Sequence, residues 1–138
     1  MKIRDLNNEI HNWKLQGYAI KANDTRPRSK LHLAARDLLA DLFPTVQILE
    51  EVVAPITRNE KLFFDFYINT LKVVVEVHGK QHYEFNTLFH TSAQDFVHQR
   101  KRDARKKEWC EYNNITYVAL PFNEKVEEWK SRILQRNN

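Results

Sequence analysis

The apolar residues of the N-terminal segment recur three or four positions apart, which is the spacing of one face of a helix. They are Ile3, Leu6, Ile10 and Trp13. Gly17 follows them and is typical of a helix end, and the polar run KANDTRPR comes next. We therefore expect residues 1–24 to form an N-terminal helical extension.

Residues 29–44 repeat the helical pattern, and strand-like segments follow them. Ser29 is a suitable N-cap and Pro44 a suitable stop, so a second helix is expected between them. Three segments rich in β-branched and aromatic residues come next, namely VQILEEVVAPI, KLFFDFYI and LKVVVEV. Only Asn69 and Thr70 separate the last two segments, which predicts an antiparallel hairpin with a loop of two residues, or alternatively of four residues at 68–71 with the same pairing.

The C-terminal part of the chain alternates between helix and strand. A long helix is expected over about residues 92–112, followed by the strand ITYVAL and a short helix within EKVEEWKSRIL. A strand that follows a helical crossover commonly lies parallel to its neighbour. The 138 residues therefore predict one α/β domain around a mixed sheet, with a core over residues 29–121 and a C-terminal helix over residues 122–138.

The composition argues against a membrane-spanning or secreted protein. A membrane span needs about 18 consecutive apolar residues, and the sequence has no such run. The N-terminal charges are not followed by the apolar core of a signal peptide. Cys110 is the single cysteine, which excludes an internal disulfide and a cysteine-rich zinc site. We therefore expect a cytoplasmic protein.

The positive charge of the chain is concentrated in one segment, RKRDARKK at residues 100–107. This segment holds six of the 22 basic residues and one of the 18 acidic ones, although the whole chain carries a net charge of only +4. It indicates an anion-binding helix face, unless it is simply a charged face exposed to water. The candidate contacts to nucleic acid are Arg100, Lys101, Arg102, Arg105, Lys106 and Lys107. Asp103 within this run is a candidate supporting residue that bridges to a neighbour.

The hairpin carries ionisable residues within apolar strands. If the strands pair across a tight loop at residues 69–70, Asp65 lies opposite Val74, and Glu76 becomes its diagonal neighbour. Asp65, Glu76 and His78 then project from one face, because side chains alternate along a strand. Two carboxylates that converge there repel each other, and a hard cation such as Mg²⁺ relieves the repulsion. The alternative is that each acid pairs with a lysine or arginine, or faces solvent.

The same residues resemble a known family. The features are DFYI, the spacing of eleven from Asp65 to Glu76, EVHGKQHY, and then RDARKKEWC and ITYVALP. Together they are similar to the PD-(D/E)XK nuclease superfamily, in particular its small branch related to very-short-patch-repair and phage or homing endonucleases. The likeness covers about residues 29–121. It implies a restriction-endonuclease-like α/β sandwich with Asp65, Glu76 and the backbone carbonyl of Val77 as metal ligands.

The sequence departs from the family pattern at two places. His78 stands where the signature lysine is expected, and an imidazole can hold the attacking water, act as a base or bind metal. Lys80 is close in sequence and is a further candidate contact to nucleic acid. On a continued strand it would point away from the site, unless Gly79 re-aims it. His32 stands where many members have a helix glutamate, and Glu51 on the first strand is a weaker substitute.

The segment after the second hairpin strand offers further candidates. Gln81 and His82 are expected to orient water or contact the scissile phosphate, with ordinary loop hydrogen bonding as the alternative. Three aromatic residues offer stacking surfaces for a distorted base, or else pack into the core: Tyr83, Phe85 and Phe89. Four histidines are an alternative metal site, but their irregular spacing and the lack of cysteine partners argue against a structural zinc: His78, His82, His90 and His98.

These features together predict an endonuclease that hydrolyses DNA with Mg²⁺, or alternatively Mn²⁺, in a bacterial or phage-infected cell. The expected substrate is duplex, nicked or branched DNA, held by phosphate contacts that do not select sequence. A homodimer is one arrangement that would allow both strands to be cut. The alternative is a nuclease-like fold that binds nucleic acid or a protein partner without cutting.

Overall fold

The computed structural model describes residues 1–20, 28–80 and 93–136. Its strands and helices, in chain order, are β1 (Lys2–Arg4), β2 (Ile10–Asn12), β3 (Tyr18–Ala19), α1 (Lys30–Leu42), β4 (Leu49–Thr57), β5 (Glu60–Ile68), β6 (Val73–His78), α2 (Ala93–Tyr112), β7 (Thr116–Pro121) and α3 (Val126–Leu134). Within these ranges no helix is both long enough and apolar enough to cross a bilayer.

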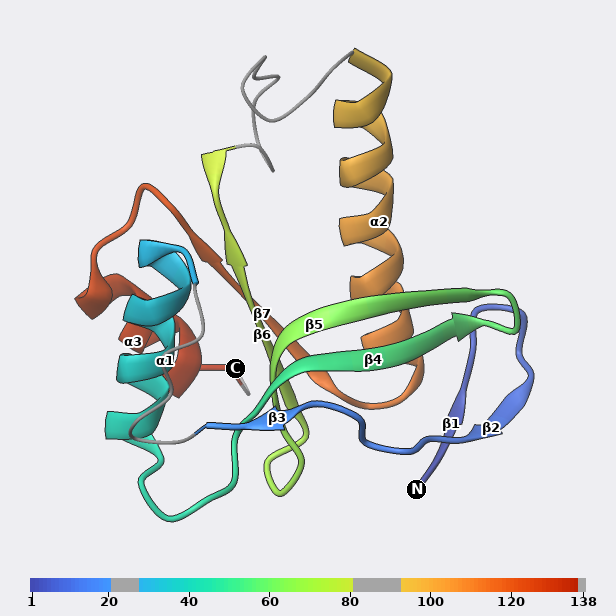
Figure 1. Cartoon of the computed structure of the whole chain (residues 1–138), viewed down its shortest axis with the longest axis horizontal. Coiled ribbons are helices and arrows are strands. Elements are labelled where there is room, and N and C mark those ends of the chain that lie inside the picture. The colour runs from blue at the N-terminus through green and yellow to red at the C-terminus, as the bar shows by residue number, and fades with distance from the viewer. Residues whose placement is uncertain (21–27, 81–92, 137–138) are drawn as a thin grey trace.

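Five of the strands form one mixed sheet in the order β3-β4-β5-β6-β7 (Figure 1). Neighbouring strands are antiparallel except for β6 and β7, which run parallel. The predicted hairpin and the predicted parallel pairing after the long helix are therefore confirmed. β1 and β2 form a separate antiparallel hairpin.

Helices contact both faces of the large sheet, and each face has its own apolar cluster. On one face, Leu39 of α1 and Ile133 of α3 belong to the cluster that contains Phe66 and Val75. On the other, Trp109 of α2 belongs to the cluster that contains Val74 and Tyr67. The expectation of a mixed α/β fold is thus correct, and the site described below lies where α1 and α2 both approach the sheet.

The predicted N-terminal helical extension over residues 1–24 is wrong, because the described part of this segment contains β1, β2 and β3 instead. The Asp5 carboxylate accepts hydrogen bonds from the backbone N–H groups of Asn7 and Glu9, at 2.8 and 2.9 Å, and so closes the turn between β1 and β2. Asn8 in this turn has a left-handed φ of 67°. Such bonds from a side chain to nearby backbone compete with helix formation. The apolar spacing was real, since Ile3 and Trp13 are buried, but it serves a hairpin and the loop after it.

Gly17 does not end a helix but allows a close approach of two backbone segments. A Cβ atom at this position would lie 2.7 Å from the carbonyl oxygen of Glu50 and 2.9 Å from Cγ2 of Val52. Real Cβ atoms essentially never show such distances, so a side chain here would force a shift of one of the two segments. The glycine therefore holds the N-terminal segment tightly against the strand that carries Glu50.

The helix predicted after Ser29 is confirmed. The Ser29 hydroxyl accepts a hydrogen bond of 3.1 Å from the backbone N–H of His32, as expected of an N-cap. The helix ends at Leu42, two residues before Pro44. Its buried side chains include His32 and Arg36 as well as Leu39, so two ionisable residues face inward beside the apolar ones.

The β5–β6 hairpin has a different register from the predicted one. Ile68 pairs with Val73 and Phe66 with Val75, so the loop spans the four residues 69–72. The difference is that Leu71 and Lys72 lie in the loop rather than in β6, and Lys72 has a left-handed φ of 55°, which a regular strand does not contain. Continued by one step, this register places Asp65 directly opposite Glu76. Because the shift is two residues, the prediction that they share a face survives.

The β4–β5 ladder is distorted next to Asp65. Its pairs include Glu50 with Phe66 and Val52 with Phe64, and between them Glu51 has a left-handed φ of 53°. Phe66 and Phe64 would share a face in a regular strand, yet they belong to the two different apolar clusters. The side chains of β5 therefore switch from one apolar cluster to the other between Phe64 and Phe66, and Asp65 lies between these two residues.

Candidate functional site

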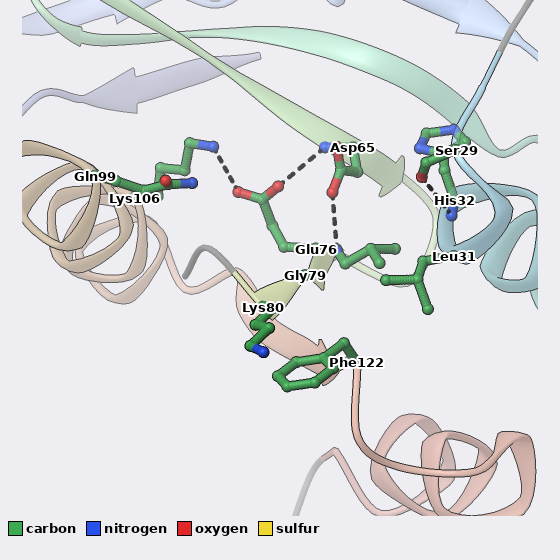
Figure 2. A pocket seen from close by; sticks show the side chains of 11 residues that line it. Ser29, Leu31, His32, Asp65, Glu76, Gly79, Lys80, Gln99, Lys106 and Phe122 are labelled. Carbon is green, nitrogen blue, oxygen red and sulfur yellow. Dashed lines mark hydrogen bonds and ion pairs between the residues drawn. The ribbon is translucent and has the colours of Figure 1, made fainter. Parts of the chain in front are cut away.

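Asp65 and Glu76 form a reciprocally bonded pair of carboxylates on adjacent strands. The backbone N–H of Asp65 donates to Oε2 of Glu76 at 3.3 Å, and the backbone N–H of Val77 donates to Oδ2 of Asp65 at 2.8 Å (Figure 2). Each carboxylate thus reaches across to the backbone of the other strand. The two acids are held on one side of the sheet, as the sequence predicted.

Burial makes the Glu76 carboxylate unfavourable in its charged form. The residue is only 3 % exposed. Desolvation, followed by repulsion from Asp65, raises the pKa of Glu76 to about 8, although Lys106 lowers it in part. At neutral pH this carboxyl therefore retains a proton unless more positive charge is brought to it.

Lys106 of α2 is the positive charge that already lowers the pKa of Glu76 in part. Its Nζ lies 2.8 Å from Oε1 of Glu76 and forms an ion pair with it. Oε1 is buried, and its contact with Nζ of Lys106 is close but does not have the angles of a hydrogen bond. No other described residue donates a hydrogen bond to it. The sequence also allowed that each acid pairs with a lysine or arginine instead of a metal. This is correct for Glu76, whereas Asp65 accepts a hydrogen bond from a backbone N–H.

An open pocket of about 600 Å³ gives solvent access to the carboxylate pair. Its lining residues come from α1, β5, β6, α2 and the segment after β7. They are Ser29, Leu31, His32, Asp65, Glu76, Val77, Gly79, Lys80, Gln99, Lys106 and Phe122 (Figure 2). Lys80 is among them: β6 ends at His78, so the continued strand on which Lys80 would point away does not form. The site is therefore both charged and accessible.

His32, the residue in the place of the family's helix glutamate, lies in the pocket wall and belongs to a buried polar network. Its Nε2 lies 3.0 Å from Oε1 of Glu50. The Arg36 guanidinium donates to both oxygens of the same carboxylate, at 2.7 and 2.9 Å. Burial alone would raise the pKa of Glu50, but the hydrogen bonds from Arg36 and His32 outweigh it and hold the pKa below the ordinary value.

Sequence reasoning missed Glu50 and Arg36 and chose Glu51 instead, which is wrong for a pocket residue. The Glu51 side chain is 42 % exposed, lies 3.2 Å from Nη2 of Arg28 and does not line the pocket. Alternation along β4 assigns one glutamate of the Glu50-Glu51 pair to each side, but the distorted backbone at Glu51 could not be foreseen. The apolar spacing of α1 carried no signal for a buried arginine.

His78 is buried and does not line the pocket. Its Nε2 is 3.0 Å from the hydroxyl of Tyr117 on β7, and the two ring centroids are 6.3 Å apart. Burial, followed by the negative charges of Glu76 and Asp103, raises the pKa of Tyr117, so the phenol stays protonated. The predicted water-holding role of His78 is therefore not supported by its position. Tyr117 was not singled out from the sequence.

The six basic residues of α2 have different surroundings. Arg100, Lys101, Arg102 and Lys107 are exposed. Arg105 donates from Nε to Glu60 at 2.9 Å, and Lys106 faces the pocket. Asp103 is half-buried on the same side of the helix as Lys106, close enough to Tyr117 to affect its pKa. The basic run thus divides into one residue ion-paired to Glu76 at the site, one residue ion-paired to Glu60 and four exposed cations.

Several predicted residues lie outside the described part of the chain. These are Gln81, His82, Tyr83, Phe85, Phe89 and His90. Within the described part, one group brings three histidine or acidic ligand atoms close together, namely Asp5, Glu9 and His11. The Asp5 carboxylate there already accepts two backbone hydrogen bonds and lies 2.6 Å from His11, which accounts for its position without a metal.

The carboxylate pair fits a hard divalent cation on three grounds. The two acids come from opposite strands and share one side of the pocket. Oε1 of Glu76 is buried with Lys106 Nζ at 2.8 Å, and burial together with repulsion from Asp65 raises the pKa of Glu76 even with this lysine present. Mg²⁺ and Mn²⁺ favour such oxygen ligands. Asp65 and Glu76 are the residues that would hold the ion.

Comparison with known proteins finds relatives but assigns no family. No protein-family model matches the chain, and no solved structure matches it significantly. The chain is 35 % identical over 74 residues to uncharacterized protein 033L of Invertebrate iridescent virus 3, covering 54 % of this chain and 38 % of the relative. It is 39 % identical over 67 residues to uncharacterized protein 307L of Invertebrate iridescent virus 6, covering 49 % and 34 %. A third relative is uncharacterized protein 094L of Frog virus 3, with 33 % identity over 85 residues, 60 % of this chain and 54 % of the relative. The matches thus span about a third to a half of each relative.

The raised pKa of Glu76 predicts an unusual dependence of stability on pH. Without divalent cations, the free energy of unfolding should fall as the pH rises from about 4.5 through about 8. The reason is that folded Glu76 keeps a proton which the unfolded chain releases in this range. Chemical unfolding of wild type and Glu76→Gln at several pH values tests this, because the substitution removes the titrating group.

The difference between the two proteins is the quantity to follow, since histidines also titrate in this range. Glu76→Gln should become progressively more stable than wild type as the pH rises. Glu51→Gln is the matched control, an exposed carboxylate on a neighbouring strand, and its profile should follow wild type. Parallel profiles for wild type and Glu76→Gln would show that Glu76 has an ordinary pKa.

Proposed function

We propose that this protein is a metal-dependent endonuclease that hydrolyses phosphodiester bonds in DNA. The observation that carries the proposal is the pair formed by Asp65 and Glu76, each bonded to the backbone of the other's strand at an open pocket. Burial of two carboxylates that repel each other is energetically unfavourable. In an accessible pocket, a bound divalent cation would neutralise this repulsion.

The topology supports assignment to the PD-(D/E)XK superfamily with its restriction-endonuclease-like fold. The motif residues occur on an antiparallel hairpin, β5–β6, whose second strand pairs in parallel with the strand after a long helix. Helices contact both faces of this sheet. The order of strand acid, strand acid, basic helix and apolar strand is that of the small branch that the sequence resembles.

The described residues divide the proposed chemistry among them. A bound Mg²⁺, or Mn²⁺ in its place, would activate a water and stabilise negative charge on the phosphate. Asp65 and Glu76 would hold the ion, with the backbone carbonyl of Val77 as a further oxygen ligand. Lys106 brings its ammonium group to this pair from α2 and takes the part of the strand lysine that His78 replaces.

The exposed cations of α2 support binding to the phosphate backbone. Arg100, Lys101, Arg102 and Lys107 lie along one helix whose inner side faces the pocket through Gln99 and Lys106. Such contacts give affinity without sequence selection, so binding should weaken as the salt concentration rises. The substrates proposed are duplex, nicked or branched DNA, and a homodimer would allow cleavage of both strands.

The setting proposed for the activity follows from the relatives. Because they are virus proteins, we place the enzyme in a virus-infected cell rather than in the bacterial or phage-infected cell expected from the sequence. The buried free thiol of Cys110 suits a reducing compartment such as the cytoplasm.

One observation favours the rival function, a nuclease-like module that binds nucleic acid or a protein partner without cutting. Lys106 already forms an ion pair with Glu76, and a lysine can replace a lost metal as the counter-charge of an acid. In that case the pocket would bind no divalent cation and the carboxylates would have only a structural role. The two experiments that follow separate these functions.

Removal of either carboxylate charge should abolish metal-dependent cleavage. We expect Asp65→Asn and Glu76→Gln to lower the cleavage rate at least about a hundredfold, because even groups that only support a metal ligand are worth up to about that factor. Binding to DNA without metal should remain within about twofold of wild type. The measurement uses labelled linear, nicked, branched and single-stranded DNA, each with and without Mg²⁺ or Mn²⁺.

The control for this experiment is Glu51→Gln, which removes a carboxylate of β4 that lies outside the pocket. It should cleave like wild type. Cleavage at the wild-type rate by both Asp65→Asn and Glu76→Gln would rule out the carboxylate pair as the metal site. Absence of cleavage by the wild-type protein on every substrate would favour the rival function.

Lys106 and Lys107 are adjacent in sequence but should respond differently to substitution. Lys106→Met removes the ammonium group from the carboxylate pair and should lower the cleavage rate about 10²- to 10³-fold, the range seen when one group that stabilises a transition state is lost. Lys107→Met removes an exposed cation and should change mainly the salt dependence of DNA binding. Single-turnover cleavage and binding titrations at two salt concentrations distinguish the two effects. Equal losses of cleavage in both variants would mean that Lys106 acts only as one more surface charge.

A further inference from the structure

The network of Glu50, Arg36 and His32 has no part in the function proposed so far. The Glu50 carboxylate is completely buried, and Arg36 and His32 are 7 % and 8 % exposed. Burial of an ion pair is expensive, and hydrophobic residues in its place are often as stable or more so. Stability alone is therefore a weak reason to bury three ionisable side chains beside the pocket.

The network fixes which nitrogen of His32 carries the proton. Hydrogen bonds from Arg36 and His32 hold the pKa of Glu50 below its ordinary value despite burial, so its carboxylate is ionised. An ionised carboxylate only accepts hydrogen bonds, and its Oε1 lies 3.0 Å from Nε2 of His32. Nε2 must therefore be the protonated nitrogen, and in the neutral imidazole Nδ1 carries the lone pair.

The ring of His32 is held rigidly at the pocket wall. Its backbone N–H is capped by the Ser29 hydroxyl, and its ring stacks on Phe66 with centroids 4.5 Å apart and an angle of 30° between the planes. Figure 2 shows His32 on one side of Asp65 and Lys106 on the other side of the carboxylate pair. An imidazole with fixed orientation and a fixed tautomer thus borders the same pocket as Asp65 and Glu76.

His78 is placed differently. Its Nε2 is engaged by the Tyr117 hydroxyl, and His78 does not line the pocket. Of these two buried histidines, His32 is therefore the one placed to meet a substrate.

We propose that His32 is the general base of the reaction, with Glu50 and Arg36 as positioning residues. This inference rests on the proposed nuclease function. Nδ1 of His32 takes a proton from the attacking water as the water oxygen bonds to phosphorus. The bond from phosphorus to the leaving sugar oxygen breaks, and that oxygen takes a proton from solvent. The imidazolium is stabilised by Glu50 until it returns its proton to solvent, the arrangement in which a base is oriented by a third group.

The first test needs no activity. Long-range proton–nitrogen NMR correlation of the ¹⁵N-labelled protein at a pH where His32 is neutral reports the tautomer, with His32→Gln used to assign the signal. We expect a protonated Nε2 and an unprotonated Nδ1. The opposite tautomer overturns the proposal, because the nitrogen left for the pocket would then have no lone pair.

The second test compares His32→Ala with His78→Gln in single-turnover cleavage, with and without added imidazole. We expect His32→Ala to lose about 10²- to 10⁴-fold in rate, the usual contribution of a general base, and to regain at least about tenfold with imidazole. DNA affinity and Mn²⁺ affinity should remain within about twofold of wild type. His78→Gln should keep at least about a tenth of the wild-type rate.

Each result of this comparison has one meaning. A His32→Ala protein that cleaves like wild type, or one whose loss imidazole does not restore, overturns the base role. Thermal unfolding checks that the variant is folded, and if it is not, His32→Gln replaces it in the same assay without imidazole and must show the same loss. Absence of cleavage by the wild-type protein is instead a failure of the proposed function, and the tautomer measurement still stands by itself.

Discussion

The repulsion between two carboxylates on adjacent strands is the constraint around which this site is built. Asp65 and Glu76 are held together because each accepts a hydrogen bond from the backbone of the other's strand. Burial and this proximity raise the pKa of Glu76 to about 8, so the pair is short of positive charge. Such an arrangement lowers the stability of the folded protein. Clusters of ionisable groups with strongly shifted pKa values in an accessible pocket are typical of functional sites.

The surrounding elements each bring one group to this pair. α2 brings the Lys106 ammonium to Glu76, and the start of α1 brings the His32 ring to the pocket wall beside Asp65 (Figure 2). Glu50 of β4 contacts His32 on the side away from the pocket. Gly17 allows the N-terminal segment to pack closely against β4 at Glu50 and Val52. The helices on the two faces of the sheet therefore reach the pocket from opposite sides. Packing in two apolar clusters fixes both helices relative to the strands.

The sequence predicted most of the elements and the facing acids, and its errors have physical causes. Side-chain alternation placed Asp65 and Glu76 on one face, and this was insensitive to a register shift of two residues. The N-terminal helix was wrong because Asp5 closes a hairpin turn, a local bond that apolar spacing does not report. His32 was chosen by resemblance, but its partner Glu50 was missed. That contact joins residues 18 positions apart and depends on how α1 packs on β4, which no local pattern encodes.

Calorimetric titration with Mn²⁺ near pH 7, in buffers of different ionisation enthalpy, tests the central claim most directly. The account predicts one Mn²⁺ per wild-type chain, with release of close to one proton, because Glu76 must lose its proton to bind the ion. Asp65→Asn should abolish this binding. The account would be contradicted if wild type bound no Mn²⁺, or if Asp65→Asn bound it equally well with the same proton release.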